Sequence, residues 1–309
     1  MTVAATYLDR LADRSAAVGT VLCLGIDPEP AALPAGFKRD VTGVEAFAML
    51  LIDAAAPFAA AVKPNLAFFE AFGSAGLAAF ERVRAAVPSG IPVVIDAKRG
   101  DIGTTSARHA AALYDSLGAD AITVSPYLGE EAIRPLLERA DRLAYVLCRT
   151  SNPGAGELQD LPLQASEGRP AEPLWARVAA RATSWGPGGT VGLVVGATAP
   201  QELAAIRALA PGLPFLVPGV GAQGGEVDLV LSSGPASAPP AGPASGSAPR
   251  PGGGLLVNVS RGIAGAAADP ATDPPGEAAG TAAGAPAMDL GERLAERARS
   301  WAARLPVLG

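Results

Sequence analysis

Short, nearly continuous apolar runs alternate along the chain with longer alanine-rich stretches of helical periodicity. Such runs are typical of strands covered on both faces, and their alternation with helices is typical of βα units around a parallel sheet. Helices are predicted at 44–56, 77–87 and 290–305, among others. Eight strands are predicted, at 21–27, 61–65, 93–98, 121–125, 144–149, 191–196, 215–220 and 255–260.

Eight βα units in about 250 residues are the content of a (β/α)8 TIM barrel. We therefore predict an α/β fold of this class, formed as a single domain over residues 1–309. A doubly wound parallel sheet is the alternative, and both folds bind ligands at the carboxyl ends of their strands. Polar or glycine residues follow the predicted strands at this edge: Asp27, Lys63, Asn65, Asp96, Lys98, Ser125, Arg149, Ser151, Gly219, Gly221 and Arg261.

Two segments depart from the βα pattern. Between positions 232 and 254 only Arg250 is not Gly, Ala, Ser or Pro, and positions 264–287 are nearly as biased. Such composition buries too little apolar surface to offset chain entropy. We expect both segments to be flexible low-complexity insertions in the barrel.

Charge and composition exclude several classes of function. The chain has 24 Lys and Arg against 30 Asp and Glu, a net charge of −6, and no basic run that would bind nucleic acid. No window approaches the roughly 20 uninterrupted apolar residues of a membrane span. Residues 1–14 lack the apolar core of a signal peptide, so a cytoplasmic protein is expected.

Residue counts narrow the chemistry further. The single histidine, His109, argues against zinc sites and histidine-based nucleophiles, and it falls in a predicted helix where a structural role is the simpler interpretation. Cys23 and Cys148 lie in separate apolar runs, where a free thiol is usually a small buried apolar group. The chemistry is therefore expected to depend on carboxylates, lysines and arginines.

The most specific chemical pattern lies at the end of the third predicted strand, where Asp96 and Lys98 are two residues apart and share a face. Asp101 follows Gly100, and it can lie beside Lys98 in the same chain or reach across an interface. An ion pair at the barrel rim is the structural alternative. Because carboxylates favour the ammonium form, Lys98 is better suited to donate a proton than to act as an amine nucleophile, although Lys63 partly offsets this effect.

A second pattern combines glycines and an arginine after strands seven and eight. TIM barrels frequently bind phosphate there, because glycines let backbone N–H groups approach the anion. Residues 218–225 read PGVGAQGG and residues 257–262 read VNVSRG. Arg261 supplies a bidentate cation and Gln223 a neutral donor, so we predict a phosphate site. Glycine turns and a rim arginine are also generic features of α/β proteins.

Two further candidates each allow a ligand-binding and a structural interpretation. Asp27 could bind ligand hydroxyls or cap the turn after the first strand. Residues 149–154 are rich in donors, yet Asn-Pro-Gly is also a turn sequence. No grouping of acids at the rim has the spacing of magnesium ligands.

Taken together, these stretches resemble the orotidine 5′-phosphate decarboxylase family, in the form typical of its type-2 bacterial subfamily. The resemblance is strongest at residues 96–105, DAKRGDIGTT, and extends through 25–27, 62–65, 150–154, 218–225 and 260–262. It implies decarboxylation of orotidine 5′-monophosphate to uridine 5′-monophosphate in pyrimidine biosynthesis, with neither a metal nor an organic cofactor. It also implies a homodimer with shared sites.

The resemblance implies a role for each matching position. Lys98 would protonate C6, with Asp96 near the substrate carboxylate, and Asp101 and Thr105 would enter the site of the neighbouring subunit. The implied catalytic residues are Lys63, Asp96, Lys98 and Asp101. The implied substrate-binding residues are Asp27 and Lys63 at the ribose, Ser151 at the pyrimidine, Gln223 and Arg261 at the phosphate, and also Thr105, Pro218 and Ser260.

Two other functions remain as alternatives. One is a magnesium-dependent sugar-phosphate lyase or decarboxylase of the same barrel superfamily, which would need a rim acid free to bind metal. The other is a catalytically silent barrel that binds a nucleotide or serves as an interaction scaffold.

Overall fold

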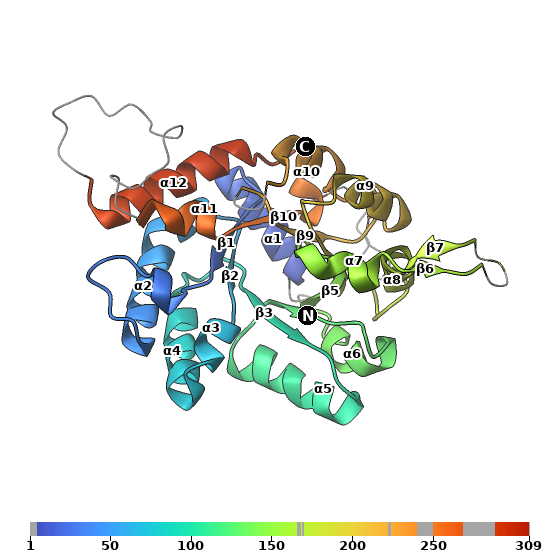
Figure 1. Ribbon diagram of the computed structural model, residues 1–309, viewed down its shortest axis with the longest axis horizontal. Coiled ribbons are helices and arrows are strands. Elements are labelled where there is room, and N and C mark those ends of the chain that lie inside the picture. Colours follow the sequence, from blue (N-terminus) through green and yellow to red (C-terminus); the bar gives the residue numbers. More distant parts are fainter. Residues whose placement is uncertain are drawn as a thin grey trace.

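The apolar runs form eight parallel strands that follow one another around a barrel (Figure 1). The computed structural model describes residues 5–165, 168, 170–221, 224–239, 250–267 and 288–308. The order around the barrel is β2-β1-β10-β9-β8-β5-β4-β3. The strands are β1 Leu22–Ile26, β2 Ala61–Pro64, β3 Val94–Arg99, β4 Ala121–Val124, β5 Leu143–Arg149, β8 Val191–Val195, β9 Phe215–Pro218 and β10 Leu256–Val259.

Two isolated parallel bridges close the barrel between its first and last strands in this order. They join Val62 to Val93 and Asn65 to Asp96, which links β2 to β3. Each of the eight strands lies within its predicted range to within one residue, so the (β/α)8 prediction is confirmed and the doubly wound alternative is wrong. The carboxyl ends of all eight strands therefore meet at one mouth.

Helices surround the barrel on its outside (Figure 1). The three predicted helices are present as α2, α4 and α12, and α12 begins with a capping box in which Asp289 and Glu292 satisfy free backbone N–H groups. The α-helices are α1 Tyr7–Val18, α2 Val41–Ala55, α3 Ala67–Glu70, α4 Gly73–Ala86, α5 Gly103–Ala110, α6 Glu130–Leu137, α7 Gly156–Gln159, α8 Leu174–Ala182, α9 Pro200–Leu209, α10 Val227–Ser233, α11 Arg261–Ala264 and α12 Leu290–Arg304.

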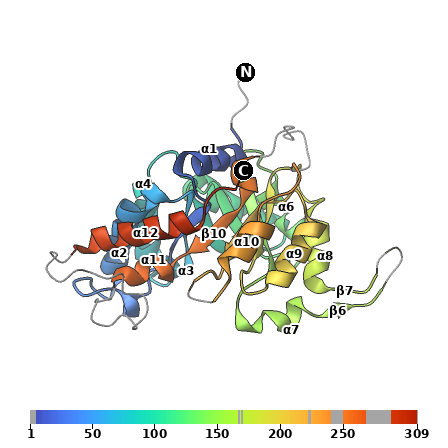
Figure 2. The same ribbon diagram turned by 90° about the horizontal axis from the view of Figure 1, so that it is seen from above.

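Helix α1 covers the amino-terminal end of the barrel, opposite the mouth (Figure 2). Its apolar side chains join the inward-facing residues of the strands in one buried cluster that includes Tyr7, Leu11 and Tyr145. The Tyr7 and Tyr145 hydroxyls lie 3.1 Å apart inside this cluster. The amino-terminal half of the barrel interior is thus a packed core.

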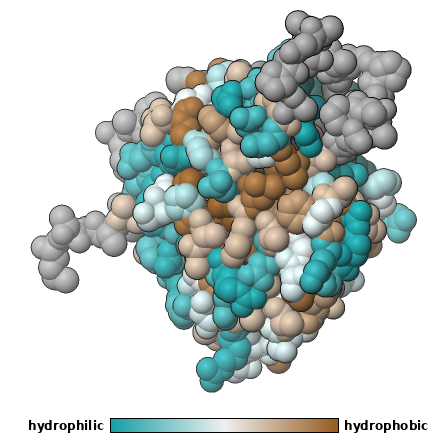
Figure 3. Space-filling model, turned by 90° about the vertical axis from the view of Figure 1, so that its left-hand side faces the viewer, coloured by the Kyte–Doolittle hydropathy of each residue, from teal (hydrophilic) through white to brown (hydrophobic). Residues whose placement is uncertain are grey.

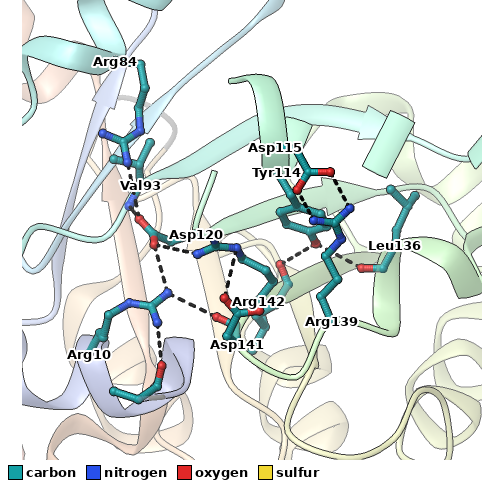
Figure 4. A network of polar contacts seen from close by, with 12 residues as sticks. Arg10, Arg84, Val93, Tyr114, Asp115, Asp120, Leu136, Arg139, Asp141 and Arg142 are labelled. Atoms are coloured by element: carbon teal, nitrogen blue, oxygen red, sulfur yellow. Dashed lines mark hydrogen bonds and ion pairs between the residues drawn. The ribbon is translucent and has the colours of Figure 1, made fainter. Parts of the chain in front are cut away.

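A network of arginines around Asp120 stabilises the same amino-terminal end (Figure 4). The Asp120 carboxylate accepts hydrogen bonds from Arg10 and Arg142 at 2.9 and 3.3 Å, and from the Val93 backbone N–H at 2.9 Å. Arg84 approaches the same carboxylate at 3.9 Å. Arg10 lies on α1 and Arg84 on α4, and the other residues directly precede β3, β4 and β5. The network therefore connects two helices to the starts of three strands.

One segment in the described part of the chain, Val41–Phe58, is long and apolar enough by composition alone to cross a membrane. It includes Glu45 and Asp53, and it packs against α4 and α12 on the side of the molecule shown in Figure 3, where hydrophobic side chains gather among hydrophilic ones. Val44, Ala48 and Leu51 are fully buried in the core. The apolar character of α2 is therefore explained by packing within the fold.

The two predicted insertions fall partly outside the described residues. In the first, the backbone N–H of Ala236 donates to Gly253, and Arg250 forms an ion pair with Asp9 on α1. Residues 240–249 and 268–287 lie outside the description, so the low-complexity insertions remain a prediction. A short hairpin of β6 Pro162–Leu163 and β7 Glu172–Pro173, which the sequence pattern did not indicate, extends the connection between β5 and α8.

Candidate active site

A buried carboxylate shared by two lysines lies at the mouth of the barrel. Lys63 on β2 and Lys98 on β3 each donate to Asp96, at 2.9 and 2.5 Å, on opposite oxygens of the carboxylate. The Lys63 side chain is 5% exposed and that of Asp96 12%, whereas that of Lys98 is 51% exposed. The Lys63 ammonium is therefore largely buried, whereas that of Lys98 is accessible to solvent.

The backbone of β3 is irregular where it carries these groups. Ile95 pairs with Ile122 and Arg99 with Val124, so three residues of β3 lie opposite the single Thr123 of β4. Lys98 has φ of 48°, the one positive φ of a non-glycine residue in the described ranges. This bulge brings Asp96 and Lys98 together more closely than a regular strand would.

Charge attraction sets the protonation states of the buried pair. Burial alone would raise the pKa of Asp96, but the ammonium groups of Lys63 and Lys98 outweigh burial and hold it well below its usual range. Burial likewise disfavours the charged form of Lys63, yet Asp96 and Asp27 raise its pKa above the ordinary value. Both groups of the pair are therefore ionised across the physiological range.

Asp101 lies in a tight turn after β3. The hydroxyl of the buried Ser106 donates to the backbone carbonyl of Asp101 at 2.8 Å, and the Asp101 carboxylate accepts from the Ile102 N–H at 2.6 Å. Within the described part of this chain, Asp101 forms no ion pair with Lys98 or any other cation. Thr105, in the first turn of α5, is partly exposed beside it.

Asp27 directly follows β1 at the mouth. Its Oδ1 is buried without a hydrogen-bond partner among the described residues, and its side chain caps no turn there. A buried carboxylate oxygen normally accepts a hydrogen bond, so Asp27 Oδ1 is suited to accept one from a ligand hydroxyl. The capping alternative is therefore wrong.

In the donor-rich segment after β5, most of the side-chain hydrogen bonds and ion pairs are formed between residues of the segment itself. Arg149 forms an ion pair with Asp160, and Thr150 hydrogen bonds with Gln159. Ser151, by contrast, has no hydrogen bond to a described residue. A side chain on Gly196 would clash with the Ser151 backbone at 2.7 Å, so this glycine lets Ser151 lie close to the end of β8.

The predicted phosphate loop is a tight glycine turn after β9. Pro218 ends β9, and Gly219, Gly221 and Gly224 have positive φ values of 99°, 80° and 82°. The Gly225 N–H donates to the Gly219 carbonyl at 3.1 Å, which closes the base of the loop. Gln223 lies outside the described residues, so its placement remains a prediction.

Arg261 begins α11, directly after Ser260 at the end of β10. Its side chain is exposed and forms no hydrogen bond or ion pair with a described residue. Ser260 is partly buried, and a side chain on Gly25 would meet its Cβ at 2.7 Å. An unengaged guanidinium beside the glycine loop is suited to bind an anion at two atoms.

Thr123 also belongs to this cluster, although the sequence pattern did not indicate it. Its hydroxyl donates to Asp96 at 2.9 Å and accepts from two backbone N–H groups of the bulge. The available signal was a hydroxyl within an otherwise apolar strand. Away from the cluster, His109 lies on α5 as predicted, and Cys23 and Cys148 are buried and free.

The described residues contain no group of three or more His, Cys, Asp or Glu side chains that could hold a metal ion. Asp96, the rim acid nearest the centre of the site, is already bound by two ammonium groups and a hydroxyl.

Comparison with known proteins points to one family. The family model described as orotidine 5′-phosphate decarboxylase / HUMPS family matches residues 20–273. A relative from Thermomicrobium roseum named orotidine 5′-phosphate decarboxylase is 46% identical over 264 residues, 85% of this chain and 88% of that protein. One of the same name from Herpetosiphon aurantiacus is 48% identical over 215 residues, 69% of this chain and 79% of that protein.

Solved structures agree with the sequence relatives. A Toxoplasma gondii structure described as an orotidine-monophosphate decarboxylase is 33% identical with a TM-score of 0.77, covering 97% of this chain and 94% of that one. A Streptomyces avermitilis structure described as an orotidine 5′-phosphate decarboxylase is 32% identical with a TM-score of 0.72, covering 98% and 95%. The chain therefore belongs to the orotidine 5′-phosphate decarboxylase / HUMPS family.

Proposed function

We propose that this chain decarboxylates orotidine 5′-monophosphate to uridine 5′-monophosphate and carbon dioxide, as the names of its relatives suggest. The observation that carries the proposal is the row Lys63, Asp96 and Lys98 at the mouth, with one ammonium buried and one directed outward. Such a row supplies a fixed positive charge without a metal ion. The function is that of a carboxy-lyase in pyrimidine synthesis, EC 4.1.1.23.

Lys98 is the proton donor in this proposal. When the bond between C6 and the carboxylate breaks, its electron pair stays in an in-plane orbital that the pyrimidine ring cannot delocalise. The Lys98 ammonium stabilises this charge and transfers a proton to C6, which leaves a neutral amine that takes a proton from water. A cation held in place before reaction stabilises the transition state more than the neutral product.

Asp96 has two tasks at this site. It holds Lys98 by the 2.5 Å contact, and it places a negative charge near the substrate carboxylate. Lys63 neutralises part of that charge from the buried side, at 2.9 Å. As the family resemblance implies, Asp27 and Lys63 bind the ribose hydroxyls and Ser151 binds the pyrimidine; Asp27 Oδ1 supports this role because it is buried without a hydrogen-bond partner among the described residues.

The phosphate provides binding energy far from the reacting carbon. Arg261, Gln223 and the backbone of the glycine loop hold the dianion, with Pro218 and Ser260 at the ends of the flanking strands. Closure of this loop over the nucleotide excludes water from C6.

We propose a homodimer in which Asp101 and Thr105 complete the partner's site. Asp101 forms no ion pair within the described part of its own chain, and the adjacent side chain of Ile102 is 62% exposed. The form of the 96–105 motif supports the type-2 bacterial subfamily, and the family supports a cytoplasmic location.

The test is a spectrophotometric assay with orotidine monophosphate, with and without EDTA. We expect turnover that survives the chelator, because the site uses ammonium groups. Loss of activity in EDTA would favour the magnesium-dependent alternative, and tight binding of 6-hydroxyuridine monophosphate without turnover would favour the silent barrel. Lys98→Ala serves as the control. It lacks the proposed proton donor, so we expect it to bind the nucleotide without decarboxylating it.

A further inference from the structure

The bulge in β3 leaves two backbone N–H groups without strand partners. Asp96, Ala97 and Lys98 lie opposite one residue of β4, so the ladder between Ile95 and Arg99 is interrupted. An unpaired buried N–H group is destabilising, which would favour a regular strand over the bulge. Something must therefore accept these hydrogen bonds.

The hydroxyl of Thr123 accepts both of them. Its Oγ1 receives the N–H groups of Ala97 and Lys98 at 3.1 and 3.0 Å. The same oxygen donates its hydrogen to Asp96 Oδ1 at 2.9 Å. A hydroxyl has one donor and two acceptor positions, so all three are used, and Thr123 is only 2% exposed.

These contacts fix the conformation that directs Lys98. Its φ of 48° is uncommon for a residue with a side chain and persists only when neighbours hold it. Thr123 Oγ1 and Lys98 Nζ also meet the same oxygen of Asp96, at 2.9 and 2.5 Å. The hydroxyl thus holds the backbone of Lys98 from one side and its carboxylate partner from the other.

We propose that Thr123 is the positioning residue that holds Lys98 in its proton-donating geometry. It acts through Lys98 and Asp96 and does not touch the substrate. The inference rests on the proposed function, which it deepens by naming the residue that keeps the donor in place. A misplacement of about 1 Å at a reacting group costs about 100-fold in rate.

The test compares Thr123→Val with Thr123→Ser. Valine has nearly the same shape without the hydroxyl, so we expect kcat to fall about 100-fold while KM for orotidine monophosphate changes less than about threefold. Serine keeps all three hydrogen bonds and should restore kcat to within about threefold of the unmodified chain. Thr123→Ala replaces the valine variant if that variant does not fold.

Thr190→Val is the matched control. Thr190 is also buried, but its hydroxyl has no hydrogen-bond partner among the described residues and it precedes β8 at the other end of the barrel. The control makes the same chemical change in a buried threonine, and we expect it to leave kcat unchanged.

A second readout does not depend on turnover. Amide hydrogen exchange of a peptide spanning 96–101 should quicken in Thr123→Val and stay the same in Thr190→Val. Unchanged exchange, an unchanged kcat in the valine variant, or a serine variant no better than valine would each overturn the proposal. If the unmodified chain and Thr190→Val both fail to turn over orotidine monophosphate, the proposed function is wrong, and the exchange data still decide whether Thr123 holds the bulge.

Discussion

At the scale of single residues, Asp96 is the group on which the site depends. Its two oxygens bind Lys63, Lys98 and Thr123, which come from three adjacent strands. Removing its charge would leave the buried Lys63 ammonium without its nearest counter-ion. A buried charge that loses its partner is among the most destabilising changes in a protein.

Asp96→Asn should therefore destabilise the fold in a pH-dependent way. The pKa of Asp96 is lowered on folding, so its contribution is present above the unfolded pKa of about 3.9 and is lost as pH falls through the folded value. We expect the substitution to cost about 3 kcal/mol in free energy of unfolding at pH 7. The difference from the unmodified chain should shrink below about pH 4.

Denaturant titrations at several pH values measure this difference. Asp115→Asn is the comparison, because Asp115 also forms an ion pair, with Arg139, but its side chain is 56% exposed. Exposed ion pairs contribute little, so the loss there should be much smaller. Equal losses for the two substitutions would contradict the burial argument.

Arg261→Ala should lower kcat/KM by about 1000-fold, because a bidentate contact to a phosphate dianion is lost and that binding energy drives closure. Steady-state kinetics with orotidine monophosphate measure it. Arg299→Ala, an exposed arginine on α12 paired with Glu296, should leave kinetics unchanged. Near-normal turnover of Arg261→Ala would show that the phosphate lies elsewhere.

The sequence was enough to predict which lysines and carboxylates form the candidate site, but not the backbone geometry that brings them together. The spacing of Asp96 and Lys98 placed them on one face, and they do touch. The bulge that brings them together depends on the register between β3 and β4, which no local pattern encodes. Thr123 gave only one local signal, a hydroxyl within an otherwise apolar strand, and its contact with Asp96 depends on the same register.

At the scale of elements, hydrophobic periodicity was a good guide because the strands are buried on both faces and the helices are long. The hairpin of β6 and β7 was missed, since each strand has two residues and one of them is proline. Helix α1 was also missed, although Thr6 and Asp9 form a capping box at its start. The two-residue strands give too little periodicity to detect, whereas the 12 residues of α1 carry a buried face that includes Tyr7, Leu8 and Leu11, so its signal was present in the sequence.

The arginine network should stabilise the barrel without affecting chemistry. Asp120→Ala leaves Arg10 and Arg142 without a shared acceptor and the Val93 N–H unpaired, so we expect a loss of about 2 kcal/mol in free energy of unfolding. The kcat should stay the same, because the network joins α1 to residues just before β3, β4 and β5, at the end of the barrel away from the mouth. A large fall in kcat in the folded variant would contradict this separation.

At the scale of the whole molecule, the proposed dimer makes each site dependent on two chains. Lys98→Ala and Asp101→Ala should each be inactive alone. In a mixed dimer, one site carries both substitutions and the other carries neither, so refolding the two variants together in equal amounts should restore about a quarter of the activity. No recovery, with mixed dimers confirmed by mass spectrometry, would place Asp101 in its own chain's site.

The burial of both native thiols has a practical consequence. Burial raises the pKa of Cys23 and of Cys148 to about 12, so neither should react with common thiol reagents. A single cysteine introduced at the exposed Ala16 of α1 would then be the preferred attachment point. Because α1 covers the closed end of the barrel (Figure 2), a chain immobilised on a solid support through this residue would present its open end to the flowing solution.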